Sequence, residues 1–82
     1  MRLNDLSLHA MARIDSIDWT ALTPADGRRL RELGFGDGVA VSVERRGGWS
    51  GRGPLACKVG RMLVAIQRVH ASAISVEPAA AA

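Results

Sequence analysis

Apolar residues recur at every second position in several short segments of the chain, which is the period of a β-strand with one buried face. The alternation is clearest over residues 39–46, 55–59 and 62–67, where valine, leucine, isoleucine and cysteine share one parity. A looser alternation over 10–19 is broken near its end and predicts a bent strand, and 74–77 predicts the last strand. The pattern therefore predicts about five short strands.

One segment between the first two strands changes to a helical pattern. Thr23 is a good N-cap and Pro24 suits the first helical position. Leu30 and Leu33 lie three residues apart on one face, and Gly34 supplies the left-handed residue that often follows a helix end. The sequence predicts a short helix that begins at Pro24 and ends before Gly34.

Turn-forming residues separate these elements. Residues 35–38 and 60–61 are turns by composition, and 69–73 fits one helical turn. The stretch 47–54 contains four glycines and a proline, which predicts a segment too flexible for regular structure and long for a hairpin loop. The predicted elements follow one another as strand, helix, three strands, helical turn and strand. This order is typical of a mainly β fold, and we predict a small antiparallel barrel. Closure of the sheet into a barrel would remove exposed strand edges.

Length and composition indicate one small domain. With 82 residues, 48% of them hydrophobic and 23% charged, the chain should form a single core over 1–78, followed by a frayed alanine tail over 79–82. Cys57 is the only cysteine, so no internal disulfide can form, which favours a reducing compartment. The sequence shows neither a signal-peptide pattern nor an apolar run long enough to span a bilayer. We expect a soluble, cytoplasmic protein.

The net charge of +3 raises the question of nucleic-acid binding. A phosphate-binding surface needs basic residues gathered on one face, usually with aromatic side chains that stack on bases. Here the arginines are spread along the chain and are accompanied by only two tryptophans and one phenylalanine. Of the tryptophans, Trp19 is expected to pack in the core or at its rim. Nucleic-acid binding is therefore retained only as an alternative.

The reactive side chains do not form a catalytic pattern. Catalysis needs two or more converging groups, whereas the two histidines lie near opposite ends of the chain and the carboxylates are scattered. Cys57 shares the apolar parity of its strand, so it is interpreted as a small buried hydrophobe rather than as a reactive thiol. No enzymatic activity is predicted.

Metal-binding motifs of the Cys-x-x-Cys, His-x-x-x-His or Glu-x-x-His kind are missing from the sequence. We therefore predict no metal site within one chain and no required cofactor. A weaker alternative is a divalent ion such as zinc that is trapped where two chains meet in a weak homodimer. The candidate ligands for such a site are His9, His70, Asp5, Asp15 and Glu77.

Two regions are candidates for contact with a partner protein, because tryptophan and arginine dominate interfaces. In the glycine-rich loop, Trp49 is either exposed for recognition or folded back over one end of the barrel, and Arg52 lies near it. On the helix, Arg28, Arg29 and Arg31 form either a contact surface or an ordinary solvated face. The glycine loop lacks a phosphate-binding motif, so nucleotide binding is not predicted.

Five pieces of the sequence follow one another in an order that is similar to a known family. The most specific is the helix with its Leu-Gly stop and following turn, residues 28–38, and the strand after it, 39–46, ends in paired arginines. A proline-led strand, a Val-Ala-Ile-Gln strand and a final strand follow at 54–59, 64–67 and 73–76. Together they resemble the FeoA domain over nearly the whole chain.

The resemblance implies an SH3-like barrel, a cytoplasmic location and association with FeoB, the membrane ferrous iron transporter that carries a cytoplasmic GTP-hydrolysing domain. The sequence departs from the family at Leu8-His9, where Pro-Gly is usual, at Gly53, where an acidic residue is usual, and at Gln67, where an arginine is usual.

The resulting hypothesis is a non-catalytic accessory module of bacterial ferrous iron uptake that docks on FeoB through the arginines of the helix and the loop around Trp49. The alternative is an SH3-like module that binds nucleic acid or acts as a repressor-type regulatory domain.

Overall fold

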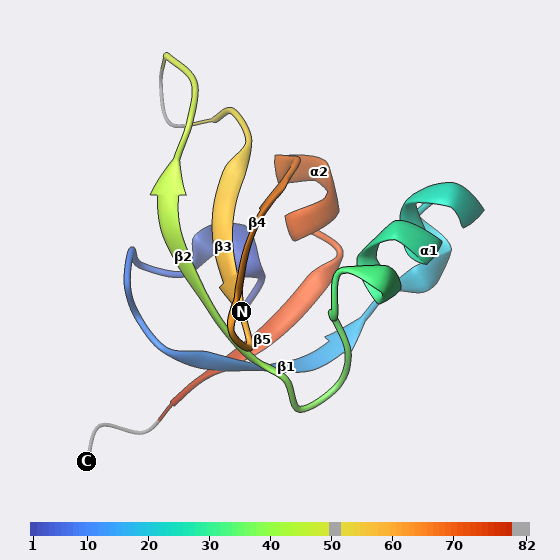
Figure 1. Ribbon diagram of the computed structural model, residues 1–82, viewed down its shortest axis with the longest axis horizontal. Helices are drawn as coiled ribbons and strands as arrows, with labels where there is room; N and C mark the ends of the chain where they lie inside the picture. The colour runs from blue at the N-terminus through green and yellow to red at the C-terminus, as the bar shows by residue number, and fades with distance from the viewer. Residues whose placement is uncertain (50–51, 80–82) are drawn as a thin grey trace.

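The computed structural model describes residues 1–49 and 52–79, which form one curled, five-stranded antiparallel sheet with short helices around it (Figure 1). The strand order is β4-β3-β2-β1-β5. The elements are η1 (Leu3–Asp5), β1 (Ala12–Ile17), η2 (Trp19–Ala21), α1 (Pro24–Glu32), β2 (Ala40–Arg46), β3 (Leu55–Val59), β4 (Met62–Ile66), α2 (Arg68–Ala71) and β5 (Ile74–Pro78). The five predicted strands and the predicted helix are confirmed, with ends that differ by two residues at most.

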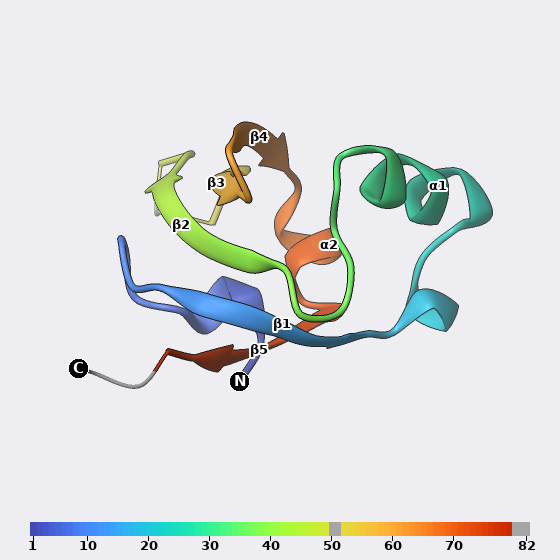
Figure 2. The same ribbon diagram turned by 60° about the horizontal axis from the view of Figure 1, so that its bottom comes forward.

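The sheet forms two layers that enclose the core. Figure 2 shows β1 and β5 in one layer and β3 and β4 in the other, with β2 bending from the first to the second. The pairing register shifts between Ile14 and Ser16 in β1 and between Val43 and Arg45 in β2. Such bulges bend a strand and increase its twist, so they allow a short sheet to curl. They also explain why the alternation of β1 breaks before Ile17, which is buried on the same side as Ile14.

The ladder of strands stays open among the described residues, because β4 and β5 are its two edges. The β5 edge is partly covered by the N-terminus: Arg2 bridges to Ser75, and the Val76 amide donates to the Met1 carbonyl at 2.7 Å. The connection through α2 spans the gap between β4 and β5 (Figure 1). The prediction of complete closure was therefore wrong, although the layered SH3-like arrangement is present.

The N-terminal turn η1 was not predicted, yet it and the residue that follows it contribute two of the most buried side chains. Leu3 is 0% exposed and Leu6 is 2% exposed. The Arg46 guanidinium holds this segment in place, donating from Nη1 to the Asn4 carbonyl at 2.8 Å and from Nη2 to the Leu6 carbonyl. One of the paired arginines at the end of β2 is thus a structural clamp for the N-terminus.

Helix α1 begins and ends as predicted. The Thr23 hydroxyl accepts a hydrogen bond from the Asp26 amide at 3.1 Å, and Gly34 adopts φ +97°, which favours glycine. The helix buries Leu30, and a Cβ added at Gly27 would lie 3.5 Å from the ring of Trp19. None of the described helices is long and apolar enough to cross a bilayer.

The described residues of the loop between β2 and β3 form no helix or strand, as predicted, but hydrogen bonds join its two arms. The Gly47 amide donates to the Pro54 carbonyl at 2.8 Å, and the Gly53 amide donates to the Gly47 carbonyl at 3.0 Å. A Cβ on Gly48 would lie 2.8 Å from the Gly53 nitrogen, so the two arms approach closely because both sides lack side chains. Glycine here makes a narrow hydrogen-bonded neck that belongs to no strand or helix. Residues 50–51 of the loop lie outside the described residues.

Candidate partner-binding surfaces

The structure places the predicted partner-binding residues in two regions rather than in one. The β2–β3 connection, which carries Trp49 and Arg52, projects from one end of the molecule, whereas α1 lies on the opposite side (Figures 1 and 2). We call the first region the hairpin tip, defined by Gly47, Gly48, Trp49, Arg52 and Gly53. The second region is the helix face, defined by Arg28, Arg29 and Arg31.

At the hairpin tip, the side chain of Trp49 is fully exposed, with a relative accessibility of 104%. The interpretation in which it folds back over one end of the barrel is therefore wrong. Arg52 is also exposed and lies on the returning arm, just above the neck. A fully exposed tryptophan on a hydrogen-bonded support is typical of a binding residue, because its large apolar surface gains nothing from the isolated fold.

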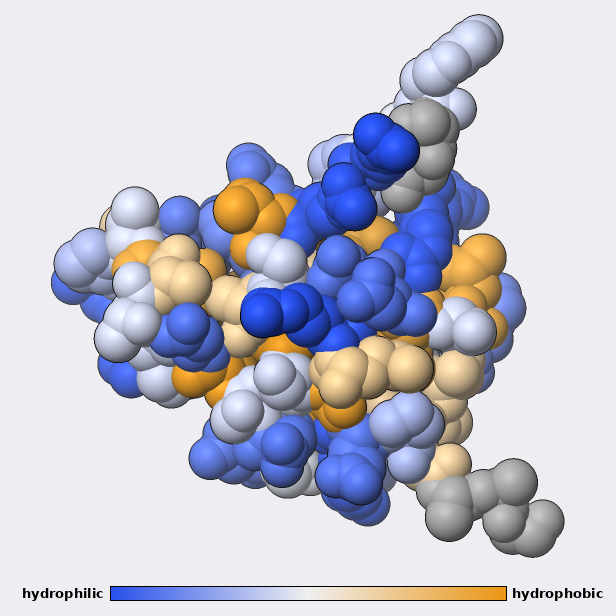
Figure 3. All heavy atoms as spheres, turned by 180° about the vertical axis from the view of Figure 1, so that it is seen from behind, coloured by the Kyte–Doolittle hydropathy of each residue, from blue (hydrophilic) through white to orange (hydrophobic). Residues whose placement is uncertain are grey.

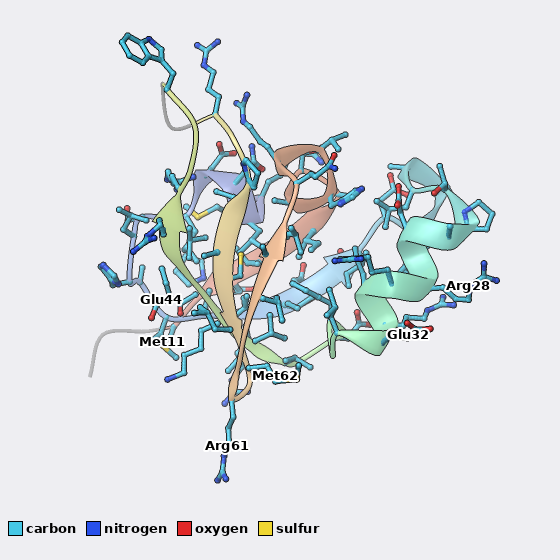
Figure 4. All side chains as sticks on the ribbon, turned by 45° about the horizontal axis from the view of Figure 1, so that its top comes forward. Met11, Arg28, Glu32, Glu44, Arg61 and Met62 are labelled. Atoms are coloured by element: carbon cyan, nitrogen blue, oxygen red, sulfur yellow. The ribbon has the colours of Figure 1, made fainter. Side chains whose placement is uncertain are left out.

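The helix face is divided between structure and solvent. The Arg31 guanidinium lies 4.2 Å from the centroid of the Trp19 ring, in a cation–π contact that fixes α1 to η2. Arg28 and Glu32 lie on the outer side of α1, away from the sheet (Figure 4). Arg29 lies at the inner edge of the helix, where it lines a groove. Of the three predicted arginines, Arg31 is thus already engaged within the chain.

The groove itself was missed by the sequence analysis. It has a volume of about 380 Å³ and lies between α1 on one side and β4 with α2 on the other. Leu30 and Ile66 contribute buried apolar surface, and Pro54 lines the groove beside them. Across it, His70 Nε2 lies 3.1 Å from Asp26 Oδ2 and connects α2 to α1. Asp26 and His70 are far apart in the sequence and share no motif, so no sequence signal could have paired them.

A second hollow of about 330 Å³ continues from the groove toward the hairpin tip. It is lined by Arg52 and Gly53 from the hairpin and by Arg68 and Val69 from α2. Pro54 and Gln67 line both hollows, so the depression runs without interruption from Arg29 on α1 to Arg52 on the hairpin. The two predicted regions are therefore separate in space but joined by one hollowed surface.

Neither predicted histidine lies beside a carboxylate that was predicted as its metal co-ligand. His9 Nδ1 lies 2.9 Å from Glu44 Oε2, and His70 pairs with Asp26. Asp15 and Glu77 line a common hollow at β1 and β5, without a histidine. Asp5 belongs to η1. Residues 1–49 and 52–79 contain no group of three His, Cys, Asp or Glu side chains that could hold a metal ion. A site between two chains remains a prediction.

Two ionisable groups have displaced pKa values. Cys57 is 0% exposed, and loss of hydration raises its pKa to about 11, so the thiol is neutral and shielded at ordinary pH. This confirms the interpretation of Cys57 as a buried hydrophobe. The pKa of Asp18 is lowered, chiefly because the Thr20 hydroxyl donates to its carboxylate at 2.5 Å. The same carboxylate accepts a hydrogen bond from the Thr20 amide at 3.2 Å, which caps η2.

The same curled sheet is found in solved structures. Chlorobium tepidum FeoA is 30% identical, with 98% of this chain and 71% of that chain covered, at a TM-score of 0.81. Stenotrophomonas maltophilia FeoA is 35% identical, with 94% and 89% covered, at a TM-score of 0.78. It was solved in complex with zinc and described as a procaryotic SH3 domain protein and a candidate activating factor for bacterial ferrous iron transport.

A FeoA-like protein from Clostridium acetobutylicum is 17% identical, with 100% of this chain and 90% of that chain covered, at a TM-score of 0.80. At this identity the similarity shows a shared fold alone. A search of curated protein sequences found no match.

Fold and comparisons together define the class of this protein as a small SH3-like β module. The family model of the FeoA domain matches residues 1–78, so the chain belongs to the FeoA family. Members of this family are accessory proteins of ferrous iron transport.

Proposed function

We propose that this protein is a non-catalytic accessory module that works in the cytoplasm and docks on the cytoplasmic part of the transporter FeoB. The observation that carries the proposal is Trp49, fully exposed on a hydrogen-bonded glycine neck in a member of the FeoA family. The fold has no need of this side chain for its core, whereas a partner could bury nearly all of it.

The contact surface that we propose follows the depression from α1 to the hairpin. Arg29 marks one end and Arg52 the other, and the apolar surface of Leu30 and Ile66 lies in the groove near the first. A groove with apolar walls at Leu30 and Ile66, with the carboxylate of Asp26 paired to His70, and with arginines at both ends is suited to a partner segment that presents an apolar side chain and carboxylates. The outer arginine Arg28 adds to the positive potential on that side, while Arg31 acts through Trp19.

Calorimetric titration against the isolated cytoplasmic domain of FeoB, in its empty, GDP-bound and GTP-bound states, tests this function. We expect binding in at least one state and about tenfold weaker binding by Trp49→Ala, because an exposed tryptophan at an interface is a typical hot spot. Met62→Ala is the matched control: Met62 is 53% exposed, but it lies at the β3–β4 turn, far from the hairpin tip (Figure 4). Absence of binding in every nucleotide state would overturn the proposal.

A divalent ion between two copies of the chain is a separate proposal. Its support is the zinc bound by the 35% identical Stenotrophomonas maltophilia protein and the exposed pair of His9 and Glu44. Light scattering with and without zinc tests it: a dimer that forms only with zinc and is lost in His9→Ala supports a site at this pair, and an unchanged monomer contradicts it.

A further inference from the structure

Charge is distributed unevenly along this chain. Residues 45–76 contain six arginine and lysine side chains and no aspartate or glutamate, whereas seven of the eight carboxylates lie within residues 1–44. The acid-free segment includes the end of β2, the hairpin, β3, β4 and α2. One continuous part of the fold therefore carries a strong excess of positive charge.

Part of this charge gathers at one end of the molecule. Arg45 at the end of β2, Arg52 on the hairpin and Arg68 on α2 are all exposed, and Arg52 and Arg68 line the same hollow. Two exposed apolar side chains belong to this end: Val69, 61% exposed, lines that hollow with Arg52 and Arg68, and Trp49 lies on the hairpin. We call these five residues the basic tip. Figure 3 shows strongly hydrophilic side chains along the projecting hairpin, seen from behind.

None of the ion pairs among residues 1–49 and 52–79 involves the basic tip, since both pairs lie elsewhere, at His9–Glu44 and at Asp26–His70. The guanidinium groups of the tip are thus available for an external anion. Arg61, by contrast, extends from the β3–β4 turn at the opposite end of the molecule (Figure 4).

We propose that the basic tip binds the surface of an anionic phospholipid bilayer. Tryptophan favours the boundary between headgroups and acyl chains, where its ring is in an apolar layer and its N–H reaches polar groups. Arginine donates paired hydrogen bonds to phosphate, and each basic residue near an anionic surface adds electrostatic attraction. Val69 supplies a second apolar side chain beside the phosphate-binding groups.

The shape of the tip favours a bilayer over a nucleic acid. A single tryptophan stands on a projecting hairpin, whereas single-stranded nucleic acid is bound in grooves along which several aromatic side chains stack on successive bases. The exposed Val69 has no partner in a phosphate backbone but can enter the interfacial layer of a membrane. The inference goes beyond docking on FeoB, and it concerns lipid alone.

Sedimentation with vesicles that contain only lipid tests the proposal. The protein should sediment with mixed phosphatidylcholine–phosphatidylglycerol vesicles, stay in solution with pure phosphatidylcholine, and be released by high salt. The double substitution Arg52→Ala with Arg68→Ala should weaken binding by about tenfold or more. The matched control, Lys58→Ala with Arg61→Ala, removes the same charge near the other end and should change binding by less than about threefold.

Fluorescence of Trp49 supplies an independent readout in a Trp19→Phe background, in which it is the only tryptophan. Its emission should shift to the blue and become protected from acrylamide with anionic vesicles alone. An unshifted emission, equal loss in the two double variants, or tighter binding to a single-stranded oligonucleotide than to the vesicles would each overturn the proposal. Because the assay contains no transporter, its failure leaves docking on FeoB unaffected.

Discussion

The two tryptophans of this chain have opposite environments. Trp19 follows β1 at the α1 side of the molecule, where it packs against the core, faces Gly27 and lies under the Arg31 guanidinium. Trp49 lies at the hairpin tip and is fully exposed. The same side chain therefore stabilises the fold in one place and is available to a partner in the other, and the difference is decided by what the tertiary structure brings against each ring.

The largest effect should come from removing the packed ring. We expect Trp19→Ala to lower the free energy of unfolding by about 3 kcal/mol, because it removes aromatic surface that is partly buried against the core together with a cation–π contact. Trp49→Ala should change it by less than about 0.5 kcal/mol, since its ring is exposed. Urea denaturation of both variants measures the contrast, and equal losses would contradict it.

The buried thiol of Cys57, in the core against which Trp19 packs and Trp49 does not, should make stability depend on pH, with an effect of slightly smaller size. Burial raises the pKa of Cys57 from 9.0 to about 11, so the unfolded chain ionises this thiol first. The thiol is neutral in both states below about pH 9, and above that the free energy of unfolding should fall by about 1.4 kcal/mol per pH unit, up to about pH 11.

Urea denaturation between about pH 8 and pH 11 measures how the free energy of unfolding changes with pH. Cys57→Ala is the control, because it has no thiol to ionise at this position. Parallel curves for the two proteins would show that the thiol does not ionise differently in the folded and unfolded states.

The glycines of the two regions should respond in opposite directions. At the hairpin, Gly48 has φ +81°, and an added Cβ would lie 2.8 Å from the Gly53 nitrogen. Gly48→Ala should therefore destabilise the protein by about 2 kcal/mol through strain and a backbone clash, and it should also disturb the position of Trp49. Thermal denaturation and the fluorescence of Trp49 report the two effects; an unchanged melting temperature would contradict the closed neck.

The smallest effect is a stabilisation at the other tryptophan. An added Cβ at Gly27 would meet the Trp19 ring at 3.5 Å, which is ordinary contact, and Gly27 lies inside α1 without a left-handed backbone. Gly27→Ala should raise the free energy of unfolding by about 0.7 kcal/mol, because alanine favours the helix. A loss of stability here would mean that the ring cannot accommodate the methyl group.

Some features could be predicted because they depend on neighbouring residues. The alternation of Leu55, Cys57 and Val59 indicated β3 with the bounds that the structure has, and Thr23 and Gly34 marked the ends of α1. Features that depend on distant contacts were missed. Leu3 and Leu6 have no periodic context, so nothing in the sequence indicated that they complete the core.

The candidate site was predicted only in part. The residue types that serve recognition, arginine and tryptophan, could be selected from the sequence, but whether Trp49 was exposed stayed open until the neck at Gly47 and Gly53 was seen. The groove between α1 and α2 could not be predicted from the sequence, because its Asp26–His70 contact joins residues from separate elements.

The sequence by itself determined the local elements, the family and the uneven distribution of charge, since periodicity, helix caps and residue order are all read along the chain. The tertiary structure alone decided the bulges that curl the sheet, the burial of η1, the groove, and the opposite environments of Trp19 and Trp49. The physical reason is that these features depend on how segments distant in sequence pack, and packing is a property of the folded chain as a whole.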